Sequence, residues 1–179
     1  MKEKTVLDYF KSCLTTDYSN FKGRARRKEY WGYILFNFLI SSMISIIDKT
    51  IFGIRTGANF TDFLTFNTLG VILLFIPTMA VLVRRYHDTN RRGWFAIIMS
   101  VLTLSFLVFP LAMQRITQRV PAGISEDPIA IAILVYGALF LLGSLATLIV
   151  ALMEGTHGSN RFGPDPKNPE NEIDALGTE

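Results

Sequence analysis

The sequence contains one cysteine and two histidines among its 179 residues. A single thiol excludes an internal disulfide and a zinc site built from paired cysteines. We expect Cys13 to be a small apolar side chain that faces inward. The sequence also lacks a P-loop, a nucleophile elbow and the glycine fingerprint of a dinucleotide-binding fold. These absences predict a protein that is not an enzyme and that carries no cofactor.

Charged side chains are missing from four long stretches of the chain, which contain no Asp, Glu, Lys, Arg or His. An α-helix rises about 1.5 Å per residue and needs roughly 20 residues to cross the hydrocarbon core of a bilayer. A soluble protein whose helices are apolar on every face would have no polar side for water. We therefore predict an all-α, polytopic membrane protein with four transmembrane helices, at residues 30–47, 63–83, 93–114 and 128–153.

The four predicted spans divide the chain into three parts. Residues 1–29 form an N-terminal segment that is first amphipathic and then basic, and residues 30–153 form the transmembrane domain. Residues 154–179 hold a motif rich in glycine and proline, which ends the last helix. We expect the acidic tail that follows this motif to be disordered.

The N-terminal segment has an amphipathic pattern over residues 5–17. Val6, Phe10 and Cys13 recur at helical spacing, while Asp8 and Lys11 lie elsewhere on the helical wheel. The pattern predicts a short amphipathic helix that lies in the membrane interface. Alternatively, its apolar stripe docks onto the cytoplasmic ends of the helix bundle.

The distribution of basic residues predicts the orientation in the membrane. Fourteen of the 18 Lys and Arg residues lie in the N-terminal segment, in the loop between the second and third spans, and in the C-terminal tail. Basic residues are enriched in cytoplasmic loops. We therefore expect a multi-pass protein of the bacterial inner membrane with both termini in the cytoplasm.

Small side chains recur every seven residues in the last predicted span, at Ala130, Gly137, Ser144 and Ala151. Seven residues are close to two helical turns, so the four residues form one narrow stripe. Such a stripe lets a neighbouring helix approach closely, which is a main source of helix association in lipid. It predicts a helix-packing face, either within the chain or between the subunits of a homo-oligomer.

Three motifs lie at the predicted cytoplasmic ends of the spans: FKGRARRKEYW (21–31), RRYHDTNRRGW (84–94) and GSNRFGPDP (158–166). Their order and spacing resemble the bacterial inner-membrane family called domain of unknown function 805. The resemblance covers roughly residues 15–170 and implies a four-helix membrane domain with cytoplasmic termini. It implies no activity, because the family has none assigned. Residues 90–92 depart from the family pattern, since Asn-Arg-Arg is more basic than the usual turn of small residues.

We expect the three motifs to meet at one cytoplasmic face and to form a structural or interaction module. In one interpretation, acidic neighbours neutralise the arginines in a structural ion-pair network. In the other, the arginines bind an anionic group such as a phospholipid head group, because a guanidinium matches phosphate bidentately. The candidate anion ligands are Arg24, Arg27, Arg84, Arg85 and Arg161. The candidate structural partners are His87, Asp88, Asn160 and Asp165, with Glu154 as a further acid.

Other functions have weaker support. Glu154 and His157 have the Glu-x-x-His spacing of metal ligands in carboxylate bundles, but the glycines beside them indicate a helix end. An ion or proton path normally needs charged residues inside the spans, and these spans contain none. We expect membrane lipids to be the partners of this protein. Nucleic acid is not expected, because membrane insertion explains where the positive charge lies.

Overall fold

The computed structural model describes residues 5–53, 65–117 and 127–167, so the predicted acidic tail lies outside the described residues. Within these ranges the chain forms helices and no strand, which confirms the all-α prediction. The helices are α1 (Val6–Leu14), α2 (Arg27–Phe52), α3 (Phe66–Asp88), α4 (Trp94–Thr117) and α5 (Asp127–Leu152). The four longer helices cover the four predicted spans, and their ends differ from the predicted ends by a few residues.

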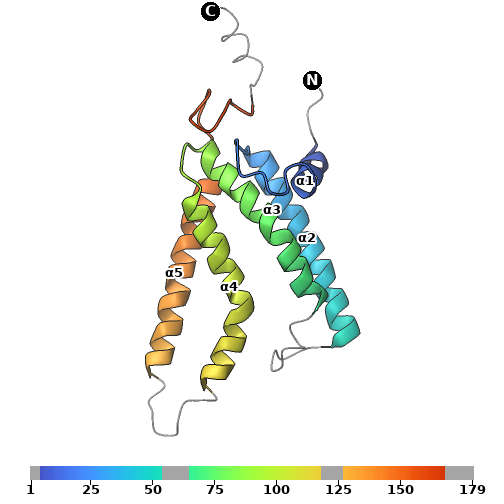
Figure 1. Cartoon of the computed structure of the whole chain (residues 1–179), viewed down its shortest axis with the longest axis vertical. Helices are drawn as coiled ribbons and strands as arrows, with labels where there is room; N and C mark the ends of the chain where they lie inside the picture. Colours follow the sequence, from blue (N-terminus) through green and yellow to red (C-terminus); the bar gives the residue numbers. More distant parts are fainter. Residues whose placement is uncertain (1–4, 54–64, 118–126, 168–179) are drawn as a thin grey trace, which may run out of the picture.

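The helices form a bundle in which neighbours along the chain pack together. α2 and α3 lie side by side, and α4 lies beside both α3 and α5 (Figure 1). α1 packs against α2 and α3 near one end of the bundle. The same end carries the turn between α3 and α4 and the segment 153–167. We call this end of the molecule the α1 end.

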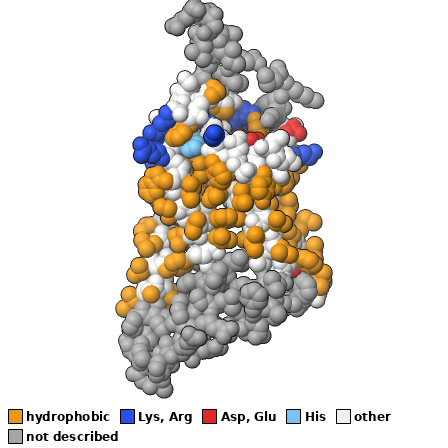
Figure 2. All heavy atoms as spheres, in the orientation of Figure 1, with side chains coloured by type: hydrophobic (Ala, Val, Ile, Leu, Met, Phe, Trp, Pro, Cys, Tyr) orange, Lys and Arg blue, Asp and Glu red, His pale blue; other side chains and the backbone are white. Residues whose placement is uncertain are grey.

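Three of the helices are long and apolar enough to cross a membrane: Arg27–Ile51, Phe66–Asp88 and Ala130–Leu152. In α4, the segment Trp94–Ser105 is also apolar. Hydrophobic side chains cover the flank of the bundle, and Lys, Arg, Asp and Glu side chains gather at the α1 end (Figure 2). An apolar flank of this kind is suited to lipid rather than to water.

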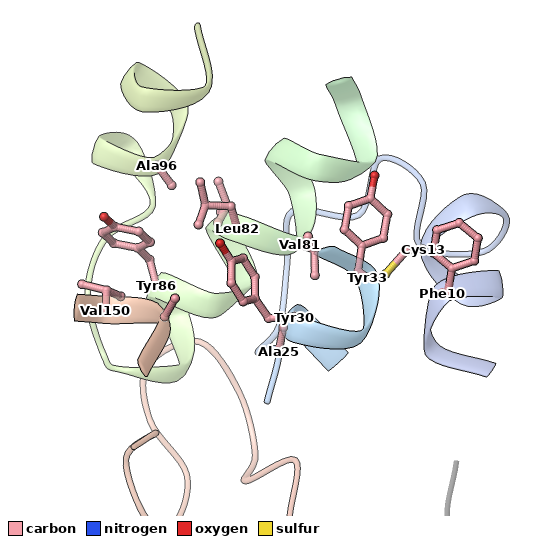
Figure 3. Packing of buried hydrophobic residues seen from close by; sticks show 12 residues of the cluster. Phe10, Cys13, Ala25, Tyr30, Tyr33, Val81, Leu82, Tyr86, Ala96 and Val150 are labelled. Carbon is pink, nitrogen blue, oxygen red and sulfur yellow. The ribbon is translucent and has the colours of Figure 1, made fainter. Parts of the chain in front are cut away.

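Buried packing is concentrated at the α1 end. The core there includes Tyr30, Tyr33, Val81, Tyr86 and Val150, which come from α2, α3 and α5 (Figure 3). Farther along α2 and α5, most of the large apolar side chains are exposed within the single chain. The α1 end is therefore the part of the molecule where close packing holds the helices together.

α1 docks onto the bundle through its apolar face. Phe10 and Cys13 are buried against α2 and α3, and the Phe10 ring packs on Tyr33 with centroids 5.8 Å apart. Gly32 lets α1 approach closely, because a Cβ added there would lie 2.5 Å from the Val6 Cγ1 atom. Of the two alternatives for this segment, the structure contains the docked helix. A position in the membrane interface stays a prediction.

Polar side chains define where two of the helices begin. Thr5 and Asp8 form a capping box at the start of α1. Asp48 comes from the last turns of α2, and its carboxylate accepts hydrogen bonds from the amides of Phe66 and Asn67, at 3.0 and 2.7 Å. These are N–H groups that the first turn of α3 leaves without helical partners. A carboxylate at the start of a helix also interacts favourably with the helix dipole.

A proline in the middle of α3 leaves one backbone carbonyl without its helical partner. Pro77 has no N–H, so the carbonyl of Leu73, four residues earlier, has no helical donor. The Tyr18 hydroxyl donates to this Leu73 oxygen at 2.7 Å. The segment after α1 is thereby attached to the interrupted hydrogen-bond ladder of α3.

The predicted small-residue stripe of α5 lies only partly on the packed side of that helix. Ala151 is buried, whereas Ala130 and Gly137 are exposed, and a Cβ added to Gly137 would meet nothing within 4 Å. The close contact with α4 is instead made at Gly143, where an added Cβ would lie 2.4 Å from the Met99 sulfur. Packing of the exposed residues against a second copy stays a prediction.

Replacement of Tyr18 by Phe should remove only the hydroxyl that serves the Leu73 carbonyl. We expect the free energy of unfolding to fall by about 1 kcal/mol, the usual net value of one hydrogen bond. The measurement is denaturation of the purified protein in detergent. In a Pro77→Ala background the restored backbone N–H can bond Leu73 itself, so the same change should have little effect. Equal losses in both backgrounds would contradict this account of Tyr18.

Candidate functional site

Backbone hydrogen bonds connect the three sequence motifs at the α1 end. The Ala25 amide donates to the Arg84 carbonyl at 3.0 Å. The Thr156 amide donates to the Asp88 carbonyl at 2.8 Å, and the Asn160 side chain donates to the His87 carbonyl at 3.0 Å. The three motifs thus lie together at the α1 end of the bundle. The last turn of α3 is the element that both other motifs contact.

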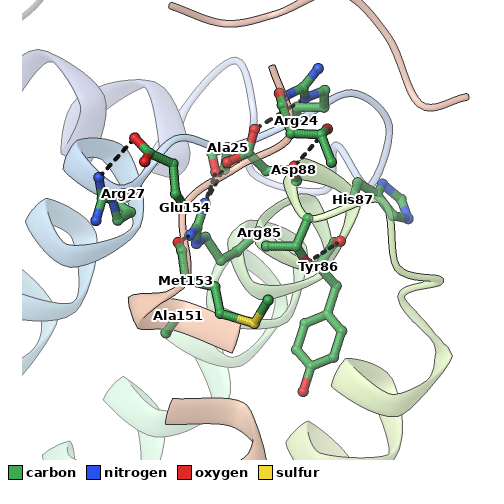
Figure 4. A network of polar contacts seen from close by, with 12 residues as sticks. Arg24, Ala25, Arg27, Arg85, Tyr86, His87, Asp88, Ala151, Met153 and Glu154 are labelled. Atoms are coloured by element: carbon green, nitrogen blue, oxygen red, sulfur yellow. Dashed lines mark hydrogen bonds and ion pairs between the residues drawn. The ribbon is translucent and has the colours of Figure 1, made fainter. Parts of the chain in front are cut away.

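The Asp88 carboxylate is the acceptor for two buried arginines. Arg24 donates to it through Nε at 3.1 Å, and Arg85 donates to its other oxygen from the preceding turn of α3 (Figure 4). Asp88 and both arginine side chains are almost fully buried. Because a buried charge is costly without a partner, this arrangement requires both cations and the anion to be present together.

The remaining donors of Arg24 and Arg85 reach backbone carbonyls of the other motifs. Arg24 donates to the carbonyls of Thr156 and Gly158, and Arg85 donates to that of Met153. Both side chains therefore connect α3 and the segment before α2 to the chain that follows α5. The Nε atom of Arg85 is buried and has no hydrogen-bond partner within the described residues.

Arg84 has a different counter-ion from its neighbour. Its Nη1 atom lies 2.5 Å from Glu29 Oε1 in the first turn of α2, and both side chains are largely buried. The sequence reasoning did not include Glu29, although it is the only acid in the basic motif at 21–31. We call the five residues Arg24, Arg84, Arg85, Glu29 and Asp88 the ion-pair network.

Cys13 lies against this network from α1. Arg84 Nη2 is 3.5 Å from its sulfur, and the side chain is buried as the sequence predicted. Burial raises the pKa of the Cys13 thiol to about 11, despite the nearby Arg84 charge. The thiol is therefore protonated at neutral pH and serves as a small packing residue, not as a nucleophile.

His87 and Asp88, which are adjacent in the second motif, have separate partners. His87 Nδ1 lies 3.1 Å from the Gly23 carbonyl oxygen, whereas Asp88 binds the arginines. The His87 ring stacks on Phe162 with centroids 3.8 Å apart. The Arg161 guanidinium carbon lies 4.7 Å from the centroid of the Phe162 ring, and Arg161 donates to the Asn90 carbonyl at 2.7 Å. These contacts give His87 a packing role between the motifs.

The third motif is a compact turn held by its own side chains. Asn160 accepts from the Phe162 amide at 2.9 Å and pairs through its backbone with Gly163. Asp165 is buried and accepts from the amides of Gly158 and Lys167. Asn160 and Asp165 therefore hold the backbone of this turn, and the partners of Asp165 here are backbone amides.

Exposed charges lie beside the buried network. Glu154 pairs with Arg27 at 3.3 Å and with Lys167 at 2.8 Å, and all three side chains are about half exposed. The hydrogen bond and the charge of Lys167, followed by Arg27, lower the pKa of Glu154. α5 ends at Leu152, so Glu154 does not share a helix face with His157. The described residues contain no group of three or more potential metal ligands.

A basic pocket of about 320 Å³ opens next to the buried network. Its wall includes two acids, Asp88 and Asp165, and both already have partners. The basic residues that line it outnumber these acids: Arg24, Arg26, Arg27, Lys28 and Lys167, together with His157. The pocket therefore carries a net positive charge.

Among the candidate anion ligands, the structure separates buried from exposed residues. Arg24, Arg84 and Arg85 are buried and paired with carboxylates, which favours the structural interpretation for them. Arg27 lines the basic pocket, and Arg161 lies on another side of the α1 end. Only these two of the five are exposed enough to meet a ligand from outside.

Apolar helices of membrane-spanning length, joined at one end by buried ion pairs, are the features of an integral membrane protein. The chain belongs to the family described as "Protein of unknown function (DUF805)", whose model matches residues 18–164. This result confirms the resemblance stated from the three motifs.

Two relatives from Escherichia coli (strain K12) are named as inner membrane proteins. Inner membrane protein YhaH is 32% identical over 151 residues, which cover 84% of this chain and 90% of the relative. Inner membrane protein YhaI is 30% identical over 151 residues, which cover 84% of this chain and 89% of the relative. No solved structure matches the chain.

Replacement of Asp88 by Asn should leave Arg24 and Arg85 buried without a counter-charge. Removing one member of a buried ion pair costs about 3–5 kcal/mol, so we expect a strong loss of thermal stability in detergent. Glu154→Gln is the matched control, because it removes an acid that is exposed and also contacts two cations. Similar melting temperatures for the two variants would contradict a central role for Asp88.

Gly155 should not tolerate a side chain, because an added Cβ would lie 2.1 Å from Asp88 Oδ2. We expect Gly155→Ala to lower the melting temperature by displacing either the carboxylate or the chain after α5. Gly137→Ala, in an open part of α5, should leave the melting temperature unchanged or raise it. If Gly155→Ala were as stable as the parent, the Asp88 site would be less tightly packed than described.

Proposed function

We propose that the chain spans the inner membrane four times, with both termini and the α1 end in the cytoplasm. The four charge-free stretches and the length of α4, 24 residues, support four spans. The excess of basic residues at the α1 end supports its cytoplasmic location. On this topology α1 lies where the bundle meets the cytoplasmic head groups, which suits its exposed Leu7.

Reporter fusions test this topology directly. Fusions after residue 89 and after residue 120 should report opposite sides of the membrane, with residue 89 in the cytoplasm. The same side for both fusions would exclude α4 as a span. A periplasmic result for residue 89 would reverse the orientation.

We further propose that the protein is a binding module and not an enzyme. The ion-pair network holds the ends of α2, α3 and α5 and the 153–167 segment as one rigid platform. The basic pocket beside it is the observation that carries the proposal, because its positive charge exceeds its negative charge. Arg27 and Lys167 are exposed at its edge and can reach an entering anion. The ligand class is a phosphate- or carboxylate-bearing group from the cytoplasm, and no nucleic acid is proposed.

Pyrophosphate is a suitable probe for the basic pocket. We expect it to raise the melting temperature of the purified protein in detergent, because a ligand that binds only the folded state stabilises it. The Arg27→Gln/Lys167→Gln variant should lose this rise. Lys11→Gln/Lys49→Gln, which removes two exposed charges outside the pocket, should keep it. An equal rise in all three proteins would overturn the proposed site.

A further inference from the structure

A second cavity, of about 610 Å³, lies on another side of the α1 end, where α3, α4 and α5 meet. Its lining has two parts. The apolar part consists of side chains from α4 and α5: Phe95, Ala146, Ile149 and Val150. The polar part consists of Asn90, Arg91, Arg92 and Arg161, and Tyr86 and Trp94 complete the lining. From these residues we propose that the cavity binds one anionic phospholipid.

In the part of the chain that the structure describes, the three arginines of this cavity have no carboxylate partner. Among the described residues, neither the Arg91 nor the Arg92 side chain forms an ion pair, and Arg91 Nη2 lies 4.0 Å from the Met153 sulfur. Arg161 donates to a backbone carbonyl and stacks on Phe162, which orients its guanidinium and leaves other N–H groups unused. The nearest motif acid, Asp88, is already bound by Arg24 and Arg85. An anion from outside the chain can neutralise this cluster.

The turn between α3 and α4 places the cluster. Asn90 adopts a positive φ of 58°, a conformation that ends α3. The amide of Asn90 donates to the His87 carbonyl, and the amide of Arg91 donates to the Tyr86 carbonyl, both at 2.9 Å. This cap fixes the backbone of the turn, so the Arg91 and Arg92 side chains extend from a rigid backbone. A preorganised cluster loses less entropy on binding than a flexible one.

The apolar part of the cavity suits an acyl chain. Ile149 is 60% exposed, and Ile98 on α4 is 51% exposed, so the apolar lining continues onto the hydrocarbon-facing flank of the bundle. Trp94 is 59% exposed between the arginines and this flank, and tryptophan prefers the depth of the lipid head groups. Figure 2 shows basic side chains at the margin of the hydrophobic flank. A phosphate at the arginines would thus place its acyl chains against α4 and α5.

The proposed occupant is a lipid rather than a free phosphate, because only a lipid has both an anionic group for the arginines and an apolar part for the apolar wall of the cavity. A free phosphate would use the arginines and leave the large apolar wall exposed. A zwitterionic lipid would use the wall but would not neutralise the cluster. The inference rests on the proposed topology, since the α1 end must lie at the cytoplasmic head groups, but not on the basic pocket beside the ion-pair network.

Native mass spectrometry of the purified protein tests the proposal. We expect one phosphatidylglycerol to bind more tightly than phosphatidylcholine. The variant Arg91→Gln/Arg92→Gln/Arg161→Gln should lose at least about tenfold in affinity for phosphatidylglycerol, since each cation near a membrane surface contributes favourably. The matched control is Lys11→Gln/Lys22→Gln/Lys49→Gln, which removes three exposed charges that line neither pocket and should bind as the parent does.

A variant that keeps every charge distinguishes a specific lipid site from nonspecific electrostatic attraction of anionic lipid. Ala146→Trp should fill the apolar part of the cavity and weaken phosphatidylglycerol binding although all arginines remain. If the triple variant fails to fold, Arg92→Gln alone should still show a measurable loss, because Arg92 is exposed and its side chain has no ion-pair partner among the described residues. Equal losses in the site variant and the control would overturn the proposal. Full displacement of the lipid by inorganic phosphate would show a free-anion site instead. Failure of the proposed topology is detected separately, by the reporter fusions after residues 89 and 120.

Discussion

The structure at the α1 end depends on one buried carboxylate, that of Asp88. Two arginines, Arg24 and Arg85, bind it from different parts of the chain, and their remaining donors bind carbonyls after α5. None of these charges is stable there alone, because the cost of removing a charge from water exceeds the value of any single hydrogen bond. The segment before α2, the end of α3 and the chain after α5 must therefore come together in one arrangement.

This network also determines which basic residues remain available outside. Glu29 and Asp88 are occupied by buried arginines. The exposed Arg27 shares Glu154 with a lysine, and Arg92 has no acidic partner within the described residues. Positive charge at the surface of the α1 end is thus a consequence of how the few acids are distributed. The two proposed binding sites use this surface charge in different surroundings, one polar and one largely apolar.

The sequence predicted elements well where one dominant physical effect acts. The ends of α2, α3, α4 and α5 agree with the charge-free stretches to within five residues, because a long run without charge is a local property of the sequence. The motifs indicated which segments meet, and they left open whether Asp88 pairs with arginine or the arginines bind an external anion. They did not predict Glu29 as the partner of Arg84, nor the use of Tyr18 at the carbonyl freed by Pro77. Both contacts join residues that are far apart in the sequence.

The sequence by itself determined the protein class, the four apolar helices and the identity of the residues at the α1 end. Those properties follow from hydrophobicity and local spacing, which need no knowledge of the fold. Only the tertiary structure decided which arginines are buried and which are exposed. Arg85 and Arg92 look alike in the sequence, yet one faces Asp88 inside the bundle and the other lines an open cavity. The difference arises because burial depends on the direction in which each side chain leaves its helix or turn, and on which distant segment covers it.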